Sequence, residues 1–215
     1  MKNTLIVAAL AAVSLPAMAE INLEEADEAV YELEKTHAFL TWTVRHNGIS
    51  GYTVNFTDFD AELDFKPEDP TASTISVSIN PTALETNFPD PERKVSWEDE
   101  LANDGKFMNA TEFSEITFVS TSAELTGDFV GTVTGDLTFL GVTKPVTLDV
   151  SFNGVANAPW FGNRDLLGFD ASTTIKRSDF GQTSLANVIS DEVVIEFSGE
   201  FLQIQSSLPG GPGPR

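Results

Sequence analysis

Residues 137–152 read Leu-Thr-Phe-Leu-Gly-Val-Thr-Lys-Pro-Val-Thr-Leu-Asp-Val-Ser-Phe, and this stretch decides the fold class. Apolar and polar residues alternate in residues 137–139 and again in residues 146–152, with a period of two. Such alternation is typical of β-strands that bury one face. Residues 141–145 between the two runs contain glycine and proline, which favour turns. The stretch therefore predicts two strands joined by a turn.

The same period of two recurs along most of the chain from Tyr31 onward. Further alternating runs occupy residues 40–44, 58–65, 75–79, 116–118, 169–175 and 193–197. Turn-forming residues separate the runs at Asn47-Gly48, 66–70, 126–128, Asn153-Gly154 and 178–181. About eight strands without a convincing amphipathic helix between them predict an all-β fold, either an antiparallel sandwich or a closed barrel.

Composition narrows the possible functions. A chain of 215 residues, 41% of them hydrophobic, is long enough for one domain with a substantial core. Its formal charge of -21 disfavours binding to nucleic acids or anionic membranes. The absence of cysteine excludes disulfides, thiolate nucleophiles, iron–sulfur clusters and cysteine-based zinc sites.

The two ends of the chain differ from the rest. Residues 1–19 combine one lysine, a short apolar run and a small-residue triplet, which predicts a secretory signal peptide. We therefore expect a periplasmic protein without stable membrane insertion, whose domain spans residues 20–204. Residues 205–215 are rich in proline and glycine and are expected to be a disordered tail.

A long excursion interrupts the strands at residues 81–112. It contains a helix-compatible patch at residues 94–101, in which Trp97 and Leu101 lie four residues apart. Long excursions of this kind are usually functional or act as covers, so we predict a lid or plug.

The two histidines, His37 and His46, lie nine residues apart in what is predicted to be one strand. An odd separation places them on opposite faces unless a bulge intervenes, so a shared metal ion is not expected. Their ordinary roles would be packing under the sheet and hydrogen bonding near the Asn47-Gly48 turn.

An acidic run follows the next turn. Asp58, Asp60, Glu62 and Asp64 alternate with apolar residues but lack the glycine and distal glutamate of a calcium loop. We therefore interpret them as the solvent face of a half-buried strand, and we predict no metal site.

Catalytic motifs are also missing from the sequence. It contains no Gly-x-Ser-x-Gly elbow, no Ser-x-x-Lys, no phosphate loop and no dinucleotide fingerprint. Sixteen phenylalanines and three tryptophans remain as the main chemical feature. They can form an ordinary core or line a cavity, and eight-stranded barrels are just wide enough for either arrangement.

Several motifs occur in a recognisable order, at residues 31–48, 56–60, 75–79, 85–87, 135–148, 168–171 and 175–181. The most specific is Gly135-Asp-Leu-Thr-Phe-Leu-Gly-Val-Thr-Lys-Pro-Val-Thr-Leu148. Together they resemble the YceI-like family of periplasmic, lipocalin-shaped polyisoprenoid-binding proteins over about residues 30–204. One departure is Glu100, which stands where many family members carry a histidine in an Arg-Asp-x-His-Leu run, so a head-group role of that histidine does not carry over.

The resemblance implies an eight-stranded antiparallel barrel whose lumen holds an isoprenoid lipid, such as a prenyl quinone or a polyprenyl phosphate. Binding of this kind needs no covalent chemistry and no other cofactor. An isoprenoid lipid needs a carrier protein in an aqueous compartment, because exposing each CH2 group to water costs about 0.8 kcal/mol of free energy. The scarcity of basic residues on an acidic chain leads us to expect a neutral head group.

Candidate lumen and mouth residues follow from this interpretation, although alternation alone does not fix which face of each strand points inward. The predicted lumen residues are Phe39, Trp42, Phe56, Ile75, Val77, Phe118, Phe139, Leu148, Val150, Phe169 and Ile195. The predicted mouth residues are Arg45, His46, Arg93, Lys94 and Arg177.

Two other functions stay open at this point. A β-sandwich carbohydrate-binding module would use exposed coplanar aromatic residues such as Trp97 and Trp160. A small hydrolase or isomerase would use His37 or His46 with a nearby carboxylate, and it would need that histidine to face the lumen.

Overall fold

The computed structural model describes residues 23–205, except for the side chains of Glu24 and Ala158. The predicted signal peptide and nearly all of the predicted tail lie outside these residues. The strands are β1 (Ala29–His46), β2 (Ser50–Phe56), β3 (Phe59–Phe65), β4 (Thr74–Ile79), β5 (Leu84–Glu85), β6 (Ile116–Leu125), β7 (Val130–Phe139), β8 (Val142–Ala158), β9 (Arg164–Lys176) and β10 (Ile189–Gln203). The helix α1 spans Pro91–Asn103, and short 3-10 turns occur at Leu23–Glu25, Pro70–Ala72, Pro159–Phe161 and Arg177–Phe180. No helix in this part of the chain is long and apolar enough to cross a membrane.

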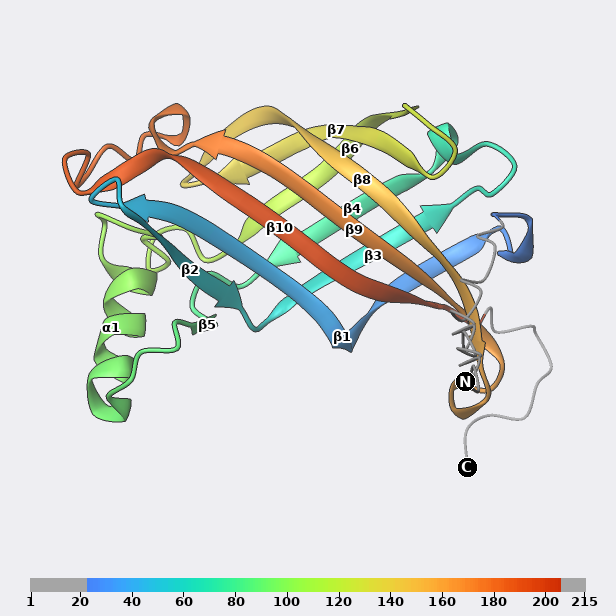
Figure 1. Ribbon diagram of the computed structural model, residues 1–215, viewed down its shortest axis with the longest axis horizontal. Helices are drawn as coiled ribbons and strands as arrows, with labels where there is room; N and C mark the ends of the chain where they lie inside the picture. Colours follow the sequence, from blue (N-terminus) through green and yellow to red (C-terminus); the bar gives the residue numbers. More distant parts are fainter. Residues whose placement is uncertain (1–22, 206–215) are drawn as a thin grey trace, which may run out of the picture.

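Eight strands close into an antiparallel barrel, as the resemblance implies. The sheet runs β10-β9-β8-β7-β6-β4-β3-β1, and β1 pairs again with β10 to complete the ring (Figure 1). Strand β1 is long enough to change partners, because its first residues pair with β3 and its last seven pair with β2. The short strands β2 and β5 therefore extend the wall at one end of the barrel.

The stretch at residues 137–152 forms the hairpin of β7 and β8, but its turn is tighter than predicted. Leu140 and Gly141 alone connect the strands, with φ angles of 50° and 71°. Two positive φ values are typical of the type I′ turn, whose twist matches that of the strands it joins. The predicted turn at residues 141–145 was therefore too long, and Pro145 lies within β8 opposite Asp136.

A second predicted turn, at Asn153-Gly154, is wrong. Strand β8 continues through these residues to Ala158, with an irregularity in its pairing to β9 between Phe152 and Gly154. Gly154 has a φ of 133°, which side-chain-bearing residues rarely adopt. Here glycine allows a bulge within a long strand.

The end of the barrel near the start of β1 is largely filled by its own side chains. Tyr31 and Leu167 are completely buried, and Phe65 and Phe201 are nearly so. The rings of Tyr31 and Phe65 meet edge to face with centroids 6.2 Å apart. On β3, the acidic residues alternate with buried apolar residues and point outward, as predicted.

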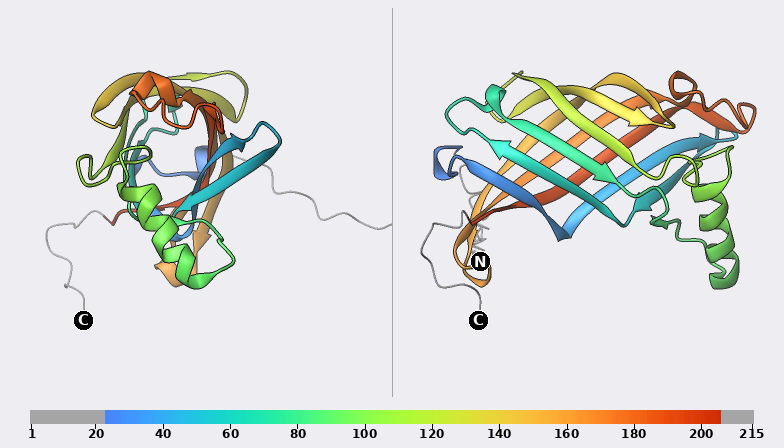
Figure 2. Two further views of the ribbon diagram at one scale, coloured as in Figure 1. Left: turned by 90° about the vertical axis from the view of Figure 1, so that its left-hand side faces the viewer. Right: turned by 180° about the vertical axis from the view of Figure 1, so that it is seen from behind.

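Helix α1 crosses the opposite end of the barrel (Figure 2). It is longer than the predicted patch because it begins at Pro91, after the cap residue Asp90. The Asp90 carboxylate accepts hydrogen bonds from the backbone N–H groups of Glu92 and Arg93 at 3.1 and 3.2 Å. Such caps satisfy donors that the first helical turn leaves free.

Candidate functional site: an apolar cavity beneath helix α1

The barrel contains a cavity of about 510 Å³ between α1 and the filled end. Inward residues of the strands form most of its wall, and they are almost all aliphatic or aromatic. The volume falls within the roughly 300–1,000 Å³ that is usual for sites binding one small molecule. The barrel interior is therefore part core and part cavity.

Most of the predicted lumen residues line this cavity. They are Trp42, Phe56, Ile75, Val77, Phe118, Phe139, Leu148 and Ile195. Val150 and Phe169 instead line a smaller apolar pocket of about 150 Å³. It shares five lining residues with the main cavity, namely Ile75, Leu148, Ala171, Phe197 and Phe201.

The structure places Phe39 outside the cavity, where it is 61% exposed. An irregularity in the pairing of β1 with β10 between Glu34 and Ala38 changes which positions point inward. Leu40, Trp42 and Val44 then point into the barrel, so Phe39 points away from it.

The predicted mouth residues separate into two groups. His46 and Arg177 line the cavity, whereas Arg45, Arg93 and Lys94 do not. The Arg93 guanidinium lies 5.7 Å from the centre of the Phe88 ring. The Lys94 ammonium pairs with the Glu85 carboxylate, and this hydrogen bond raises the pKa of Lys94.

Arg177 is buried and binds the loop that precedes β10. Its guanidinium donates to the carbonyl oxygens of Ser190 and Ser184 at 2.8 and 3.1 Å, and to the Gln182 side chain at 3.0 Å. It also reaches the Ile189 carbonyl at 3.4 Å. Burial lowers the pKa of Arg177. These contacts hold in place residues 182–190, which comprise the loop before β10 and the first two residues of that strand, and they occupy most of the donors of the Arg177 side chain.

The segment predicted as a lid contributes directly to the cavity wall. Trp97 and Leu101 of α1, followed by Phe107 and Met108, all line the cavity. The Trp97 indole N–H donates to the Tyr52 hydroxyl on β2 at 2.7 Å. A further hydrogen bond, from the Gln182 side chain to the Phe107 carbonyl at 2.7 Å, joins this segment to the loop at residues 182–190.

Sequence reasoning missed Tyr52, Phe107 and Met108. Only the alternation of Tyr52 with Val54 and Phe56 pointed to the inward face of β2. No periodic signal marked Phe107 and Met108, because they lie in an irregular segment after α1.

Trp42 carries an unusual polar group. Its indole nitrogen is buried and has no hydrogen-bond partner among the described residues. Its ring meets that of Tyr52 edge to face, with centroids 6.5 Å apart. A buried donor without a partner costs about 1–3 kcal/mol, so pairing of this N–H would stabilise the protein.

The aromatic residues proposed for carbohydrate binding do not form one platform. Trp97 faces the cavity, whereas Trp160 is 80% exposed on the β8–β9 connection. In Figure 1 that connection lies at the opposite end of the barrel from α1.

Comparison with known proteins decides the family. Residues 31–201 match the YceI-like domain. The chain belongs to the YceI-like family. Protein YceI of Shigella flexneri is 36% identical over 177 residues, which cover 81% of this chain and 87% of the relative.

Solved structures of YceI-like and related proteins share this barrel. The Campylobacter jejuni YCEI protein superposes with a TM-score of 0.63 at 28% identity, covering 73% of this chain and 88% of that one. A polyisoprenoid binding domain from Saccharophagus degradans, implicated in plant cell wall breakdown, has a TM-score of 0.56 at 16% identity. That superposition covers 82% of this chain and 99% of that domain.

Within this YceI-like chain, Glu100 lies on the exposed side of α1 and does not line the cavity. The position that departs from the family pattern is therefore separate from the cavity wall.

Proposed function

We propose that this YceI-like protein binds one isoprenoid lipid in its barrel cavity, without covalent chemistry, and carries or stores it in the periplasm. The observation that carries the proposal is an almost wholly apolar cavity of about 510 Å³ inside a closed barrel. Such a cavity removes prenyl groups from water, and each buried CH2 contributes about 0.8 kcal/mol. The likeness of fold to a polyisoprenoid binding domain supports the same ligand class.

The polar groups of the cavity favour a neutral head group such as a quinone. Among the described lining residues, only His46 and Arg177 have basic side chains. Arg177 already donates to three carbonyl oxygens and an amide, so a pyrophosphate would find little free positive charge. We infer that the unpaired N–H of Trp42, which is buried in the cavity wall, turns toward one uncharged acceptor, such as a quinone carbonyl, when the ligand binds.

A binding titration tests the ligand class. The purified protein is titrated with a detergent-solubilised prenyl quinone and with a prenyl diphosphate of equal chain length, at low and high salt. We expect tighter binding of the quinone, with little dependence on salt. Comparable affinity for both ligands, with a steep salt dependence for the diphosphate, would contradict the preference for a neutral head group.

Two variants on β9 locate the binding site. Ala171→Trp places a large side chain in the cavity wall, and Thr174→Trp places the same side chain on the exposed face of the strand. We expect the first variant to lose quinone binding and the second to retain it. Equal binding by both folded variants would place the ligand outside the barrel.

The periplasmic part of the proposal rests on residues 1–19 alone. Release of the protein from its host by osmotic shock, with residues 1–19 removed, would support it. Retention of an unprocessed chain in the cytoplasmic fraction would contradict it.

A further inference from the structure

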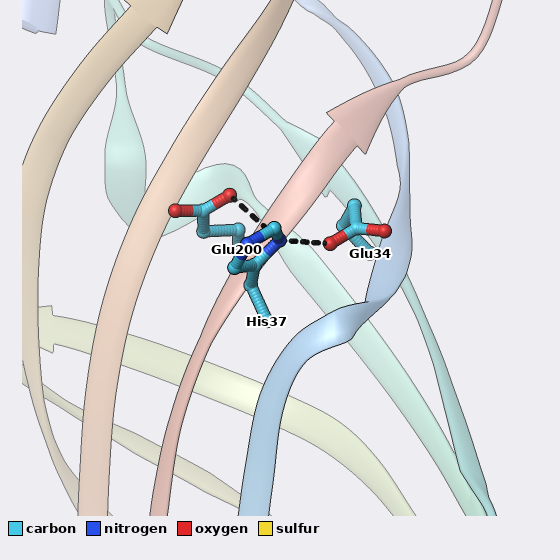
Figure 3. A group of neighbouring side chains, drawn as sticks. All are labelled: Glu34, His37 and Glu200. Atoms are coloured by element: carbon cyan, nitrogen blue, oxygen red, sulfur yellow. Dashed lines mark hydrogen bonds and ion pairs between the residues drawn. The ribbon is translucent and has the colours of Figure 1, made fainter. Parts of the chain in front are cut away.

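Strand β1 carries a large bulge on the outer face of the barrel, away from the lipid cavity. Glu34 pairs with Glu200 of β10, and the next pair along the ladder is Ala38 with Gly199. Residues 35–37 are therefore inserted on β1 without any matching residue on β10. The insertion directs the His37 ring toward both Glu34 and Glu200 (Figure 3).

The three side chains bring potential metal ligands close together. His37 Nδ1 lies 2.6 Å from Glu34 Oε2 and 3.9 Å from Glu200 Oε2. One ligand atom from each residue lies within 4.8 Å of the other two. Zinc bonds of about 2.0–2.2 Å at tetrahedral angles would place ligand atoms about 3.4 Å apart, which lies between the two observed spacings.

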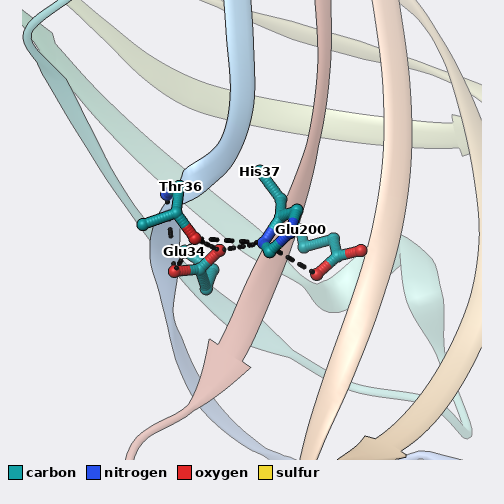
Figure 4. Close-up of polar contacts among 4 residues, drawn as sticks. All are labelled: Glu34, Thr36, His37 and Glu200. Carbon is teal, nitrogen blue, oxygen red and sulfur yellow. Dashed lines mark hydrogen bonds and ion pairs between the residues drawn. The ribbon is translucent and has the colours of Figure 1, made fainter.

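Glu34 is held in place more firmly than its partners. Its side chain is only 10% exposed, compared with 61% for His37 and 41% for Glu200. The Thr36 hydroxyl lies 2.8 and 2.7 Å from the two Glu34 carboxylate oxygens (Figure 4). One ligand is thus fixed against the barrel wall, while the outer side of the cluster stays open to solvent.

Among the described residues, the His37 imidazole is the basic group that pairs with the two carboxylates of the cluster. Two carboxylates directly opposite each other on antiparallel strands repel one another. Within residues 23–205, no lysine or arginine forms an ion pair with Glu34 or Glu200. The neighbouring Lys35 extends toward Asp60 and Asp58 instead.

We propose that Glu34, His37 and Glu200 bind a divalent transition-metal ion such as Zn²⁺. One imidazole and two carboxylates form a donor set that suits zinc better than calcium or magnesium, which prefer oxygen ligands alone. Three protein ligands leave a coordination position for water. The ion would also join β1 to β10, the pair of strands that closes the barrel.

The sequence alone did not predict this site. The expectation of no metal rested on the separation of His37 from His46 and on the acidic residues of β3. Glu200 lies far along the chain and becomes a neighbour of His37 only through the pairing of β1 with β10.

Equilibrium dialysis of the EDTA-treated full chain against Zn²⁺ tests the proposal, with metal content measured on the retained protein. We expect one Zn²⁺ per wild-type chain, no stoichiometric binding by His37→Asn, and affinity at least tenfold weaker for Glu200→Gln. Glu196→Gln removes an exposed carboxylate from the same strand and should bind like wild type.

A second readout separates a built site from general attraction to an acidic surface. Zn²⁺ should raise the thermal unfolding temperature of wild type and Glu196→Gln, and Ca²⁺ at the same concentration should not. Absence of Zn²⁺ binding by wild type would overturn the proposal. Equal binding by all variants, or equal effects of Ca²⁺ and Zn²⁺, would also overturn it. The cluster lies outside the cavity, so the outcome of the Zn²⁺ experiments does not depend on whether the protein binds a lipid.

Discussion

Substitution of Trp42 tests whether its indole N–H forms a hydrogen bond to the bound ligand. Replacing Trp42 with phenylalanine removes the donor and retains an aromatic ring in the cavity wall. A hydrogen bond between an uncharged donor and acceptor contributes about 0.5–1.5 kcal/mol, and burial of an unpaired donor costs about 1–3 kcal/mol. We therefore expect Trp42→Phe to bind a prenyl quinone more weakly by about 1–2 kcal/mol, which corresponds to roughly 5–30-fold.

The assay compares two ligands by native mass spectrometry titration. The prenyl quinone carries acceptors, whereas a polyprene hydrocarbon of similar length carries none. Trp42→Phe should bind the hydrocarbon within about twofold of wild type, since both proteins then lack the hydrogen bond. Trp160→Phe changes an exposed tryptophan outside the cavity and serves as the matched control. An equal loss of affinity for both ligands would contradict a hydrogen bond from Trp42 to the quinone, because the effect would then come from packing.

Three further predictions concern stability. Tyr31 is fully buried and its hydroxyl donates to the Asp27 carbonyl at 2.8 Å, so Tyr31→Phe should lower the free energy of unfolding by about 1–2 kcal/mol in urea titrations; no change would contradict this role. Arg177→Met should destabilise the protein by about 2–4 kcal/mol and speed hydrogen exchange in residues 182–190, whereas unchanged exchange there would show that the guanidinium does not hold the loop. The Ser178 side chain and backbone N–H donate to the Asp191 carboxylate and lower the pKa of Asp191. Its contribution to stability is therefore present above about pH 4 and is lost as pH falls through the lower folded pKa, so the difference in stability between wild type and Asp191→Asn should shrink in acid.

Much of the barrel could be predicted from local patterns. Alternation identified the strands because each buries one face, and the turn at Asn47-Gly48 is where the sequence placed it. Glycine positions predicted the turns less reliably. Gly141 forms a two-residue turn, whereas Gly154 forms a bulge within β8, and the two positions look alike in the sequence.

The site was less predictable for physical reasons. Phe39 and Trp42 belong to opposite faces of β1, and the bulge before Ala38 decides which face is inward. Phe107 and Met108 join the cavity through the irregular segment after α1, which no local pattern encodes. Glu200 and His37 meet only through long-range pairing.

The most direct test of isoprenoid binding is native mass spectrometry of the protein purified from its own host, followed by organic extraction. We expect one co-purifying species per chain, with the mass of a prenyl lipid and an uncharged head group. A mass equal to the protein alone, together with failure to take up added prenyl quinone, would contradict it and would mean that the YceI-like fold is present here without isoprenoid binding.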